Sequence, residues 1–232
     1  MFPIRDTIRS RSFPIITLLI IAANVVVFFF ELSLSPASLE RLIDMFGLVP
    51  ARLNLANPFS FYPFLTHMFL HAGWLHIISN LWTLFIFGDN IEDRMGPVGY
   101  LLFYLFGGFV AGGLQVLFNP GSTIPSIGAS GAIAAVLGAY LLYFPRARVI
   151  TFIPLFFLPW FVEISALIYL GFWFISQLFS GVLSITAAGE VQTGGVAWWA
   201  HVGGFLFGML IALPSLLRPS RRTHYPDEFY PW

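Results

Sequence analysis

The chain has 232 residues, of which 58% are hydrophobic, 18% aromatic and only 9% charged, and its formal net charge is zero. A soluble domain cannot bury so much apolar surface, and the basic residues, eleven arginines and no lysine, are too scattered to follow nucleic-acid phosphates. Because cysteine is absent, disulfides, thiolate nucleophiles and cysteine-rich zinc sites are excluded, which leaves hydroxyl, imidazole and carboxylate chemistry.

Six apolar runs follow one another along the chain, and they predict an all-α polytopic membrane protein with six transmembrane helices. The runs cover residues 13–30, 73–88, 97–118, 130–144, 159–183 and 198–217. A β-barrel is a poor alternative, because the runs are apolar all round, with proline and glycine at their borders. We expect residues 1–12 to form a short N-terminus, residues 13–217 the membrane domain in the lipid bilayer, and residues 218–232 a flexible tail.

The arginines predict how the chain is oriented in the membrane. Nine fall on one side of the predicted helices and two on the other: Arg5, Arg9, Arg11, Arg94, Arg146, Arg148, Arg218, Arg221 and Arg222, against Arg41 and Arg52. Because positive residues favour the cytoplasmic side, both termini are predicted to be cytoplasmic. The first run is followed by further runs, so no removable leader is expected, and no organelle-targeting extension precedes it. A multi-pass protein of a bacterial plasma (inner) membrane is therefore the predicted location.

Two segments between the runs have their own expected roles. Residues 31–72 are rich in Phe and Pro and almost uncharged after Arg52, so they are predicted to form short helices that lie partly in the outer leaflet. Residues 184–197 are rich in small residues, and we expect them to act with the fifth run as a lid over a cavity.

Polar residues gather at the outer ends of the second, fourth and sixth runs, which all cross the membrane from outside to inside. They are His76 and Asn80, the segment Gly128-Ala129-Ser130-Gly131, and His201. The fourth run covers only about 22 Å at helical rise, against a hydrocarbon thickness of about 30 Å. Ser130 would therefore begin its helix below the outer boundary, a depth that requires a water-filled cavity.

These residue types can perform acyl-transfer chemistry. Ser130 can act as a nucleophile and His201 as its base, while the first-turn N–H groups of a helix have no intrahelical acceptors and can stabilise an oxyanion. His76 and Asn80 are four residues apart on one helical face and can donate to the same oxyanion. Gly128 and Gly131 flank Ser130 and would let the chain turn sharply into its helix. Small residues also form a stripe on each of two runs and would allow these helices to approach closely: Ser130, Ala134 and Gly138 on the fourth, and Ala200, Gly204 and Gly208 on the sixth.

A third catalytic member is not evident, because the only acidic residue within a run is Glu163, at the inner end of the fifth run. We expect Glu163 either to extend to the inner interface or to pair with Arg146 or Arg148. A Ser-His dyad is therefore preferred to a triad. A metal site is disfavoured because no carboxylate or thiol accompanies the histidines. His67 and His71 are expected to satisfy loop backbone.

Other interpretations remain open at this point. His76 and Asn80 could tie two helices together by hydrogen bonds, and His201 could relay protons. The competing class of protein is a small transporter that uses His76 and His201 as a relay. Such a protein would not need Ser130 to react covalently with an acylating or phosphonylating reagent.

Taken together, these motifs resemble the rhomboid intramembrane serine proteases over about residues 67–208. The matching motifs are HAGWLHIISN in the second run, Glu92-Asp93-Arg94 before the third, GASG at the start of the fourth and AHVGGFLFG in the sixth. The resemblance implies a six-helix fold, no cofactor or metal, and cleavage of single-span membrane proteins near the outer face at a small residue. It implies Ser130 as nucleophile, His201 as base, and the Ser130 amide with His76 and Asn80 as oxyanion donors.

Two positions depart from the family pattern. Many relatives have an aromatic residue four positions after the serine, stacked on the catalytic histidine, where this chain has Ala134. Trp198 or Phe205 would then have to brace His201. An aromatic-Arg pair often precedes the Thr66-His67 position, where this chain has Tyr62-Pro63.

Overall fold

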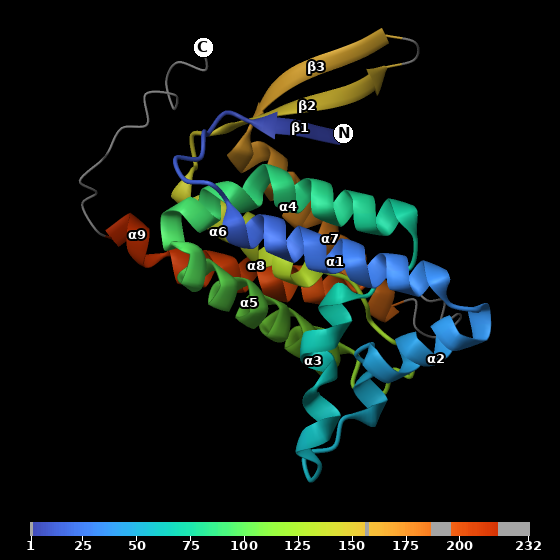
Figure 1. Ribbon diagram of the computed structural model, residues 1–232. Coiled ribbons are helices and arrows are strands. Elements are labelled where there is room, and N and C mark those ends of the chain that lie inside the picture. The colour runs from blue at the N-terminus through green and yellow to red at the C-terminus, as the bar shows by residue number, and fades with distance from the viewer. Residues whose placement is uncertain (1, 156–157, 187–195, 218–232) are drawn as a thin grey trace.

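The structure, a computed structural model, describes residues 2–155, 158–186 and 196–217, and these form a mostly helical bundle (Figure 1). Its six long helices are α1 (Ile15–Ser33), α4 (Trp74–Met95), α5 (Pro97–Phe118), α6 (Ser130–Tyr143), α7 (Ala166–Thr186) and α8 (Trp198–Ala212). The short α9 (Pro214–Leu217) follows α8. The predicted tail and residues 187–195 of the predicted lid lie outside the described residues.

Among the described residues, four helices are long and apolar enough to cross a membrane: α1, α5, α7, and α8 continued by α9. The segment Pro58–Phe69 and α4 would make a fifth span if counted together, although they meet at 84°. Helix α6 has only 14 residues and falls short of a spanning length. The chain is thus a polytopic helical membrane protein, and the predicted number of six spans is not confirmed.

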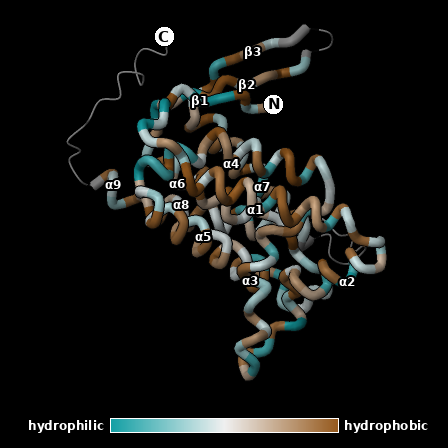
Figure 2. Tube along the Cα trace, in the orientation of Figure 1, coloured by the Kyte–Doolittle hydropathy of each residue, from teal (hydrophilic) through white to brown (hydrophobic). Residues whose placement is uncertain are grey.

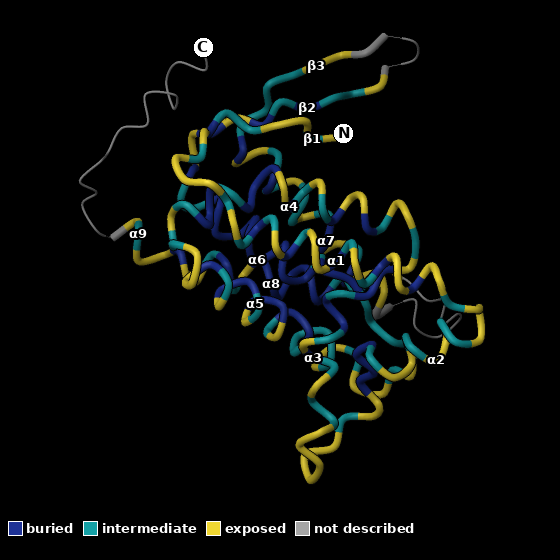
Figure 3. Tube along the Cα trace, in the orientation of Figure 1, coloured by how far each residue is buried: buried dark blue, intermediate teal, exposed yellow. Residues whose placement is uncertain are grey.

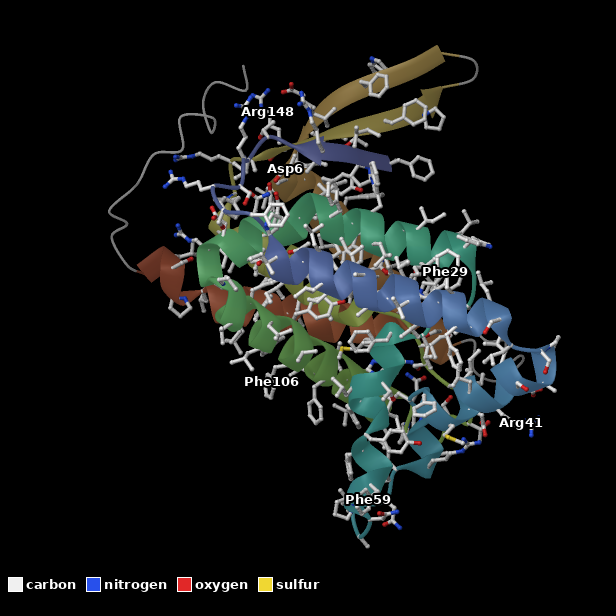
Figure 4. The ribbon with its side chains drawn as sticks, in the orientation of Figure 1. Asp6, Phe29, Arg41, Phe59, Phe106 and Arg148 are labelled. Atoms are coloured by element: carbon white, nitrogen blue, oxygen red, sulfur yellow. The ribbon has the colours of Figure 1, made fainter. Side chains whose placement is uncertain are left out.

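Helix α6 forms the centre of the bundle, and its sequence explains why. All residues from Gly131 to Leu141 are buried, and most are Ala or Gly, so neighbouring helices approach it from every side. Figure 3 shows the buried backbone concentrated around α6 and α8. The outer sides of α1 and α5 carry large apolar residues instead, such as Phe29 and Phe106, which point away from the bundle as expected for lipid contact (Figures 2 and 4).

The end of α4 holds the start of α1. The buried carboxylate of Glu92 accepts hydrogen bonds from the backbone N–H groups of Ile16 (2.9 Å) and Thr17 (2.8 Å) and from the Thr17 hydroxyl (2.8 Å). These donors belong to the first turn of α1, which has no intrahelical acceptors for them. Arg94 lies 5.3 Å from the ring centre of Tyr143 and connects α4 to α6. The Glu92-Asp93-Arg94 motif therefore fixes three helices at one end of the bundle.

The first loop contains the short helices that the sequence predicts. They are α2 (Pro36–Phe46), α3 (Pro63–Thr66) and the 3₁₀ turns η1 (Pro50–Arg52), η2 (Pro58–Phe61) and η3 (His67–Phe69). The loop projects sideways from the bundle, and its tip carries Phe59, which is 82% exposed (Figure 4). Apolar exposure of this kind fits a membrane-associated segment.

The prediction of an all-α fold is wrong, because the chain also forms a three-stranded antiparallel sheet. Its strands are β1 (Phe2–Asp6), β2 (Arg148–Leu155) and β3 (Leu158–Ser165), in the order β1-β2-β3. The N-terminus is therefore part of the fold, and the predicted fifth helix starts at Ala166 instead of residue 159. The Trp82 indole N–H donates to the Pro3 carbonyl at 2.6 Å and ties the sheet to α4.

The residues of the hairpin explain why it forms strands. It is rich in β-branched and aromatic residues, and Pro154 and Pro159 oppose a helix through it. Val149 and Thr151, two residues apart, are fully buried on the inner face of the sheet. Glu163 pairs with Arg148 across the two strands at 3.1 Å, so the expected ion pair is present, but within a sheet.

Candidate active site

Ser130 and His201 meet where α6 and α8 begin. Ser130 is the first residue of α6, and His201 lies in the first turn of α8. The Ser130 Oγ atom is 2.7 Å from His201 Nε2, which is a good hydrogen-bond distance. Ser130 is half-buried, and His201 is only 7% exposed. The two residues predicted to form a dyad are therefore in direct contact.

Glycines allow this contact by letting α8 lie directly on α6. A Cβ atom added to Gly204 would overlap the carbonyl oxygen of Gly131, and one added to Gly208 would overlap the carbonyl oxygen of Ala135. A Cβ added to Gly131 would lie 2.7 Å from the Cβ of Ala111 on α5. Gly131, Gly204 and Gly208 thus lie where neighbouring helices leave no space for a side chain.

A cavity of about 760 Å³ opens beside Ser130 and His201. It is bordered by α4, α6, α7, the start of α8 and the loop that precedes α6. His76 and Asn80 of α4 line it together with Ser130 and His201. All four residues predicted to carry the chemistry therefore face one space.

Gly128 shapes the side of the cavity next to the serine. Its φ angle is +119°, a conformation that residues with a Cβ rarely adopt. A Cβ at this position would also lie 2.6 Å from His76 Nε2, too close for van der Waals contact. The Gly128 N–H donates to the His67 carbonyl at 2.9 Å, which holds the loop in place. The glycine is therefore required both by its backbone and by the space beside His76.

His76 and Asn80 present hydrogen-bond donors to the cavity. The backbone N–H of Ala72 donates to His76 Nδ1 at 3.3 Å, so the imidazole proton belongs on Nε2, the atom that faces Gly128. The Asn80 Nδ2 atom is buried and has no hydrogen-bond partner within the described part of the chain. A buried, unpaired donor is costly for stability, and such groups are frequent where a ligand or reacting group binds.

The side chains that brace His201 come mainly from α7, and the sequence did not reveal the most important one. The Oε1 atom of Gln177 is 2.7 Å from His201 Nδ1, and the ring of Trp173 lies 5.7 Å from the imidazole. Trp198, one of the two residues expected to brace His201, meets the imidazole edge-on with ring centres 6.2 Å apart, whereas Phe205 stacks on Phe174. The sequence did contain a signal for this residue: Gln177 is an amide within an apolar run and follows Trp173 by one helical turn.

Ala134, where many relatives have an aromatic residue, lies in the α6–α8 contact. Ala134 is fully buried, and a Cβ atom built on Gly204 would lie 3.2 Å from the Cβ atom of Ala134. An aromatic ring does not fit in so narrow a space. In this chain the side chains that brace His201 come from α7 instead, namely Gln177 and Trp173.

The remaining polar residues near the site bond elsewhere. His67 Nδ1 is 2.7 Å from the Pro63 carbonyl, in keeping with the expected backbone role. Glu31 was overlooked: it is buried at the end of α1 and accepts the His71 N–H at 3.2 Å and 3.3 Å. In the residues that the structure describes, no group of three or more His, Asp or Glu side chains could hold a metal ion.

A protein-family comparison gives a match over most of the chain. Residues 58–218 match the model of the Rhomboid domain. These residues include the first-loop helix α3 and all helices from α4 to α8, and they contain Ser130, His201, His76 and Asn80.

Curated relatives carry the same family name. RHOMBOID-like protein 6, mitochondrial, of Arabidopsis thaliana is 32% identical over 158 residues, which cover 67% of this chain and 44% of the relative. The human Presenilin-associated rhomboid-like protein, mitochondrial, is 30% identical over 197 residues, 82% of this chain and 45% of the relative. Rhomboid-like protein 11, chloroplastic, of Arabidopsis thaliana is 43% identical over 74 residues, 32% of this chain and 26% of the relative. The chain spans less than half the length of these relatives.

The predicted bacterial plasma membrane is contradicted by these comparisons. Several of the relatives are named as mitochondrial or chloroplastic proteins, not as proteins of a bacterial plasma membrane. The prediction depended on the absence of a targeting extension, and a sequence start is poor evidence for that. A multi-pass membrane location is supported by the helices described above.

Proposed function

The chain belongs to the rhomboid family, and we propose that it is an intramembrane serine endopeptidase that cleaves other membrane proteins through Ser130 and His201. Family membership suggests intramembrane protease activity. The observation that carries the proposal for this chain is the 2.7 Å contact between Ser130 Oγ and His201 Nε2 beside a cavity that His76 and Asn80 also line. A nucleophile hydrogen-bonded to its base is the arrangement that activates a serine.

In the proposed reaction, His201 Nε2 takes the proton of the Ser130 hydroxyl while Oγ attacks the carbonyl carbon of the substrate peptide bond. The new C–O bond converts the carbonyl oxygen into an oxyanion. When this intermediate collapses, the C–N bond breaks and His201 gives its proton to the leaving amine. Water then attacks the acyl-serine with His201 again as base, and releases the carboxylic acid and free Ser130.

The proposed oxyanion site consists of the Ser130 backbone N–H, His76 Nε2–H and Asn80 Nδ2. The first of these is free for this role because it belongs to the first turn of α6. The hydrogen bond from the Ala72 N–H to His76 Nδ1 supports the tautomer in which His76 carries its proton on Nε2. The Asn80 Nδ2 atom is buried and has no hydrogen-bond partner among the described residues. Donors fixed in a low-dielectric site stabilise a developing charge strongly, because they need no reorganisation.

The proposed substrates are single-span membrane proteins, cut near the outer face at a small residue, as the family resemblance implies. A helical segment hides its peptide bonds behind side chains and its own hydrogen bonds, so the substrate must unwind locally to reach Ser130. The cavity of about 760 Å³ beside Ser130 and His201 has room for a short segment of the substrate chain. A six-span arrangement, in which α6 crosses only part of the bilayer, belongs to the same proposal.

Cleavage in liposomes tests this function. The purified protein would be reconstituted with a single-span model substrate that carries, near the outer face, a small residue beside a helix-destabilising stretch. We expect cleavage by the unmodified chain and by the control variant Ser33→Ala, which removes an exposed serine hydroxyl at the end of α1. Ser130→Ala and His201→Ala should abolish it. Cleavage that persists in folded Ser130→Ala would overturn the proposal.

A further inference from the structure

Three hydrogen bonds in series connect His201 to the backbone of α7. The His201 Nδ1 atom is 2.7 Å from Gln177 Oε1, and Gln177 Nε2 donates to Ser176 Oγ at 2.9 Å. The Ser176 hydroxyl in turn donates to the carbonyl of Trp173 at 2.6 Å. Gln177 is only 7% exposed, as is His201, so water competes little for these bonds.

The directions of these bonds determine one another. A backbone carbonyl can only accept, so the Ser176 hydroxyl must donate to Trp173 and is left as an acceptor for Gln177. The Gln177 amide must then present its NH₂ group to Ser176 and its oxygen to His201. An oxygen at this place requires a proton on His201 Nδ1. His201 Nε2 therefore keeps a free lone pair, which is what a base for Ser130 needs.

We propose that Gln177, oriented by Ser176, is a positioning residue that holds His201 in the tautomer and ring orientation required to activate Ser130. This inference rests on the proposed protease function. The Trp173 ring, 5.7 Å from the imidazole, belongs to the same turn of α7 and limits the rotation of the imidazole from one side. One helix turn thus supplies both the hydrogen bond and the packing contact.

An amide has a different effect from the carboxylate of a Ser-His-Asp triad. It carries no charge, so it fixes the imidazole without the large cost of burying an ion in the membrane. Gln177 contacts the ring nitrogen opposite to the one that contacts Ser130. Its removal should therefore slow the chemical step and leave substrate binding unchanged.

The first test replaces the amide. Gln177→Met keeps the length of the side chain but has no oxygen acceptor, whereas Gln177→Glu keeps an acceptor of the same length. We expect kcat to fall about tenfold to a hundredfold in Gln177→Met, because loss of orientation in a catalytic group has effects of that order, with KM changed less than about twofold. Gln177→Glu should recover part of the lost kcat, because it restores an acceptor for His201 Nδ1 but buries a charge.

Gln115→Met is the matched control for this substitution. The Gln115 amide also bonds to α8, since its Oε1 atom accepts the backbone N–H of Ala200 at 3.3 Å, but it does not bond to the imidazole. If Gln177 only anchored α8 to its neighbours, the two substitutions should reduce kcat equally. A larger fall for Gln177→Met, by at least about fivefold, is the result that our account expects.

The second test replaces the hydroxyl that orients the amide. Ser176→Ala allows the Gln177 amide to turn over, so kcat should fall about threefold to tenfold, and Ser176→Thr should restore it. Ser184→Ala serves as control, because Ser184 makes the same kind of bond, to the Gly181 carbonyl at 2.7 Å, at an exposed place on α7. These variants decide the question even if Gln177→Met does not fold.

The possible outcomes separate this inference from the proposed function. If the unmodified, folded protein does not cleave a substrate, or if folded Ser130→Ala cleaves it equally well, the protease proposal fails and the inference falls with it. If the protein cleaves through Ser130 but folded Gln177→Met or Ser176→Ala keeps the unmodified kcat, only the inference is overturned. A fall in kcat that Gln177→Glu or Ser176→Thr rescues supports it.

Discussion

The Ser130 Oγ atom lies 2.7 Å from His201 Nε2, although 71 residues separate the two in the chain. Their contact depends on the start of α6 lying beside the start of α8, which glycines at 131, 204 and 208 make possible. On the other ring nitrogen, His201 meets Gln177. The imidazole is therefore held between a hydroxyl on α6 and an amide on α7.

Substitution of the proposed oxyanion donors should reduce turnover more than binding. We expect His76→Ala and Asn80→Ala each to lower kcat about a hundredfold, because loss of one such donor costs roughly 2.7–4 kcal/mol in other acyl-transfer enzymes. Steady-state cleavage of a detergent-solubilised substrate measures the effect. Equal kcat values for Asn80→Ala and the unmodified protein would remove the Asn80 amide from the mechanism.

The α6–α8 contact should not tolerate even one additional methyl group at Gly208. Gly208→Ala places a Cβ against the carbonyl oxygen of Ala135, so we expect a loss of stability of about 1–3 kcal/mol and a lower Tm. Gly113→Ala on α5 is the control, because no atom of the described residues lies within 4 Å of its added Cβ. Thermal unfolding in detergent compares the two, and similar Tm values would contradict this account of the packing.

Glu92 should be important for the stability of α1. Glu92→Ala leaves the N–H groups of Ile16 and Thr17 and the Thr17 hydroxyl without their acceptor, so the expected cost is about 2–4 kcal/mol. Glu92→Gln, which keeps one acceptor oxygen, should cost less. Glu40→Ala, on the exposed surface of α2, serves as the reference. Denaturant unfolding should place Glu92→Ala well below both other variants.

The docking of the N-terminal strand should depend on pH. Burial raises the pKa of Asp6 to about 8, while its hydrogen bond from Tyr140 partly opposes this shift. The protonated carboxyl is therefore the form that the folded state prefers. Stabilisation by this group is complete below its unfolded pKa of about 4 and is lost as the pH rises through about 8.

Hydrogen exchange of the β1–β2 amides measures this effect. Protection of these amides should decrease between about pH 4 and about pH 8 and change little above that, after correction for the intrinsic exchange rate, and Asp6→Asn should make it nearly independent of pH. The Asn90 amide, which donates to Asp6 Oδ2 at 2.9 Å, can still bond to the new side chain. The same decrease in Asp6→Asn would show that another group titrates.

Much of the site could be predicted because membrane helices restrict where polar residues can lie. Ser130, His76, Asn80 and His201 each occur near the outer end of a run with the same direction, so their depths agree before any fold is known. The stripes of small residues also predict which helices approach closely. The structure brings all four residues to one cavity for these reasons.

The parts that could not be predicted depend on tertiary partners or on ambiguous patterns. The hairpin of β2 and β3 is as apolar as a membrane helix, and periodicity does not distinguish a short apolar strand from a helix. Gln177 has no distinctive local motif, and its role appears only when α7 lies beside α8. The predicted bacterial location was wrong because the residue at which a sequence begins says little about where the protein is targeted.

The most direct test of the central claim is reaction of the detergent-purified protein with a fluorophosphonate probe, which labels an activated serine covalently. The account predicts labelling of the unmodified chain at Ser130, shown by mass spectrometry of the modified peptide, and none in folded Ser130→Ala or His201→Ala. A folded, unmodified protein that does not label and does not cleave a membrane substrate would contradict the account. It would favour the alternative that the protein is a small transporter in which His76 and His201 relay protons.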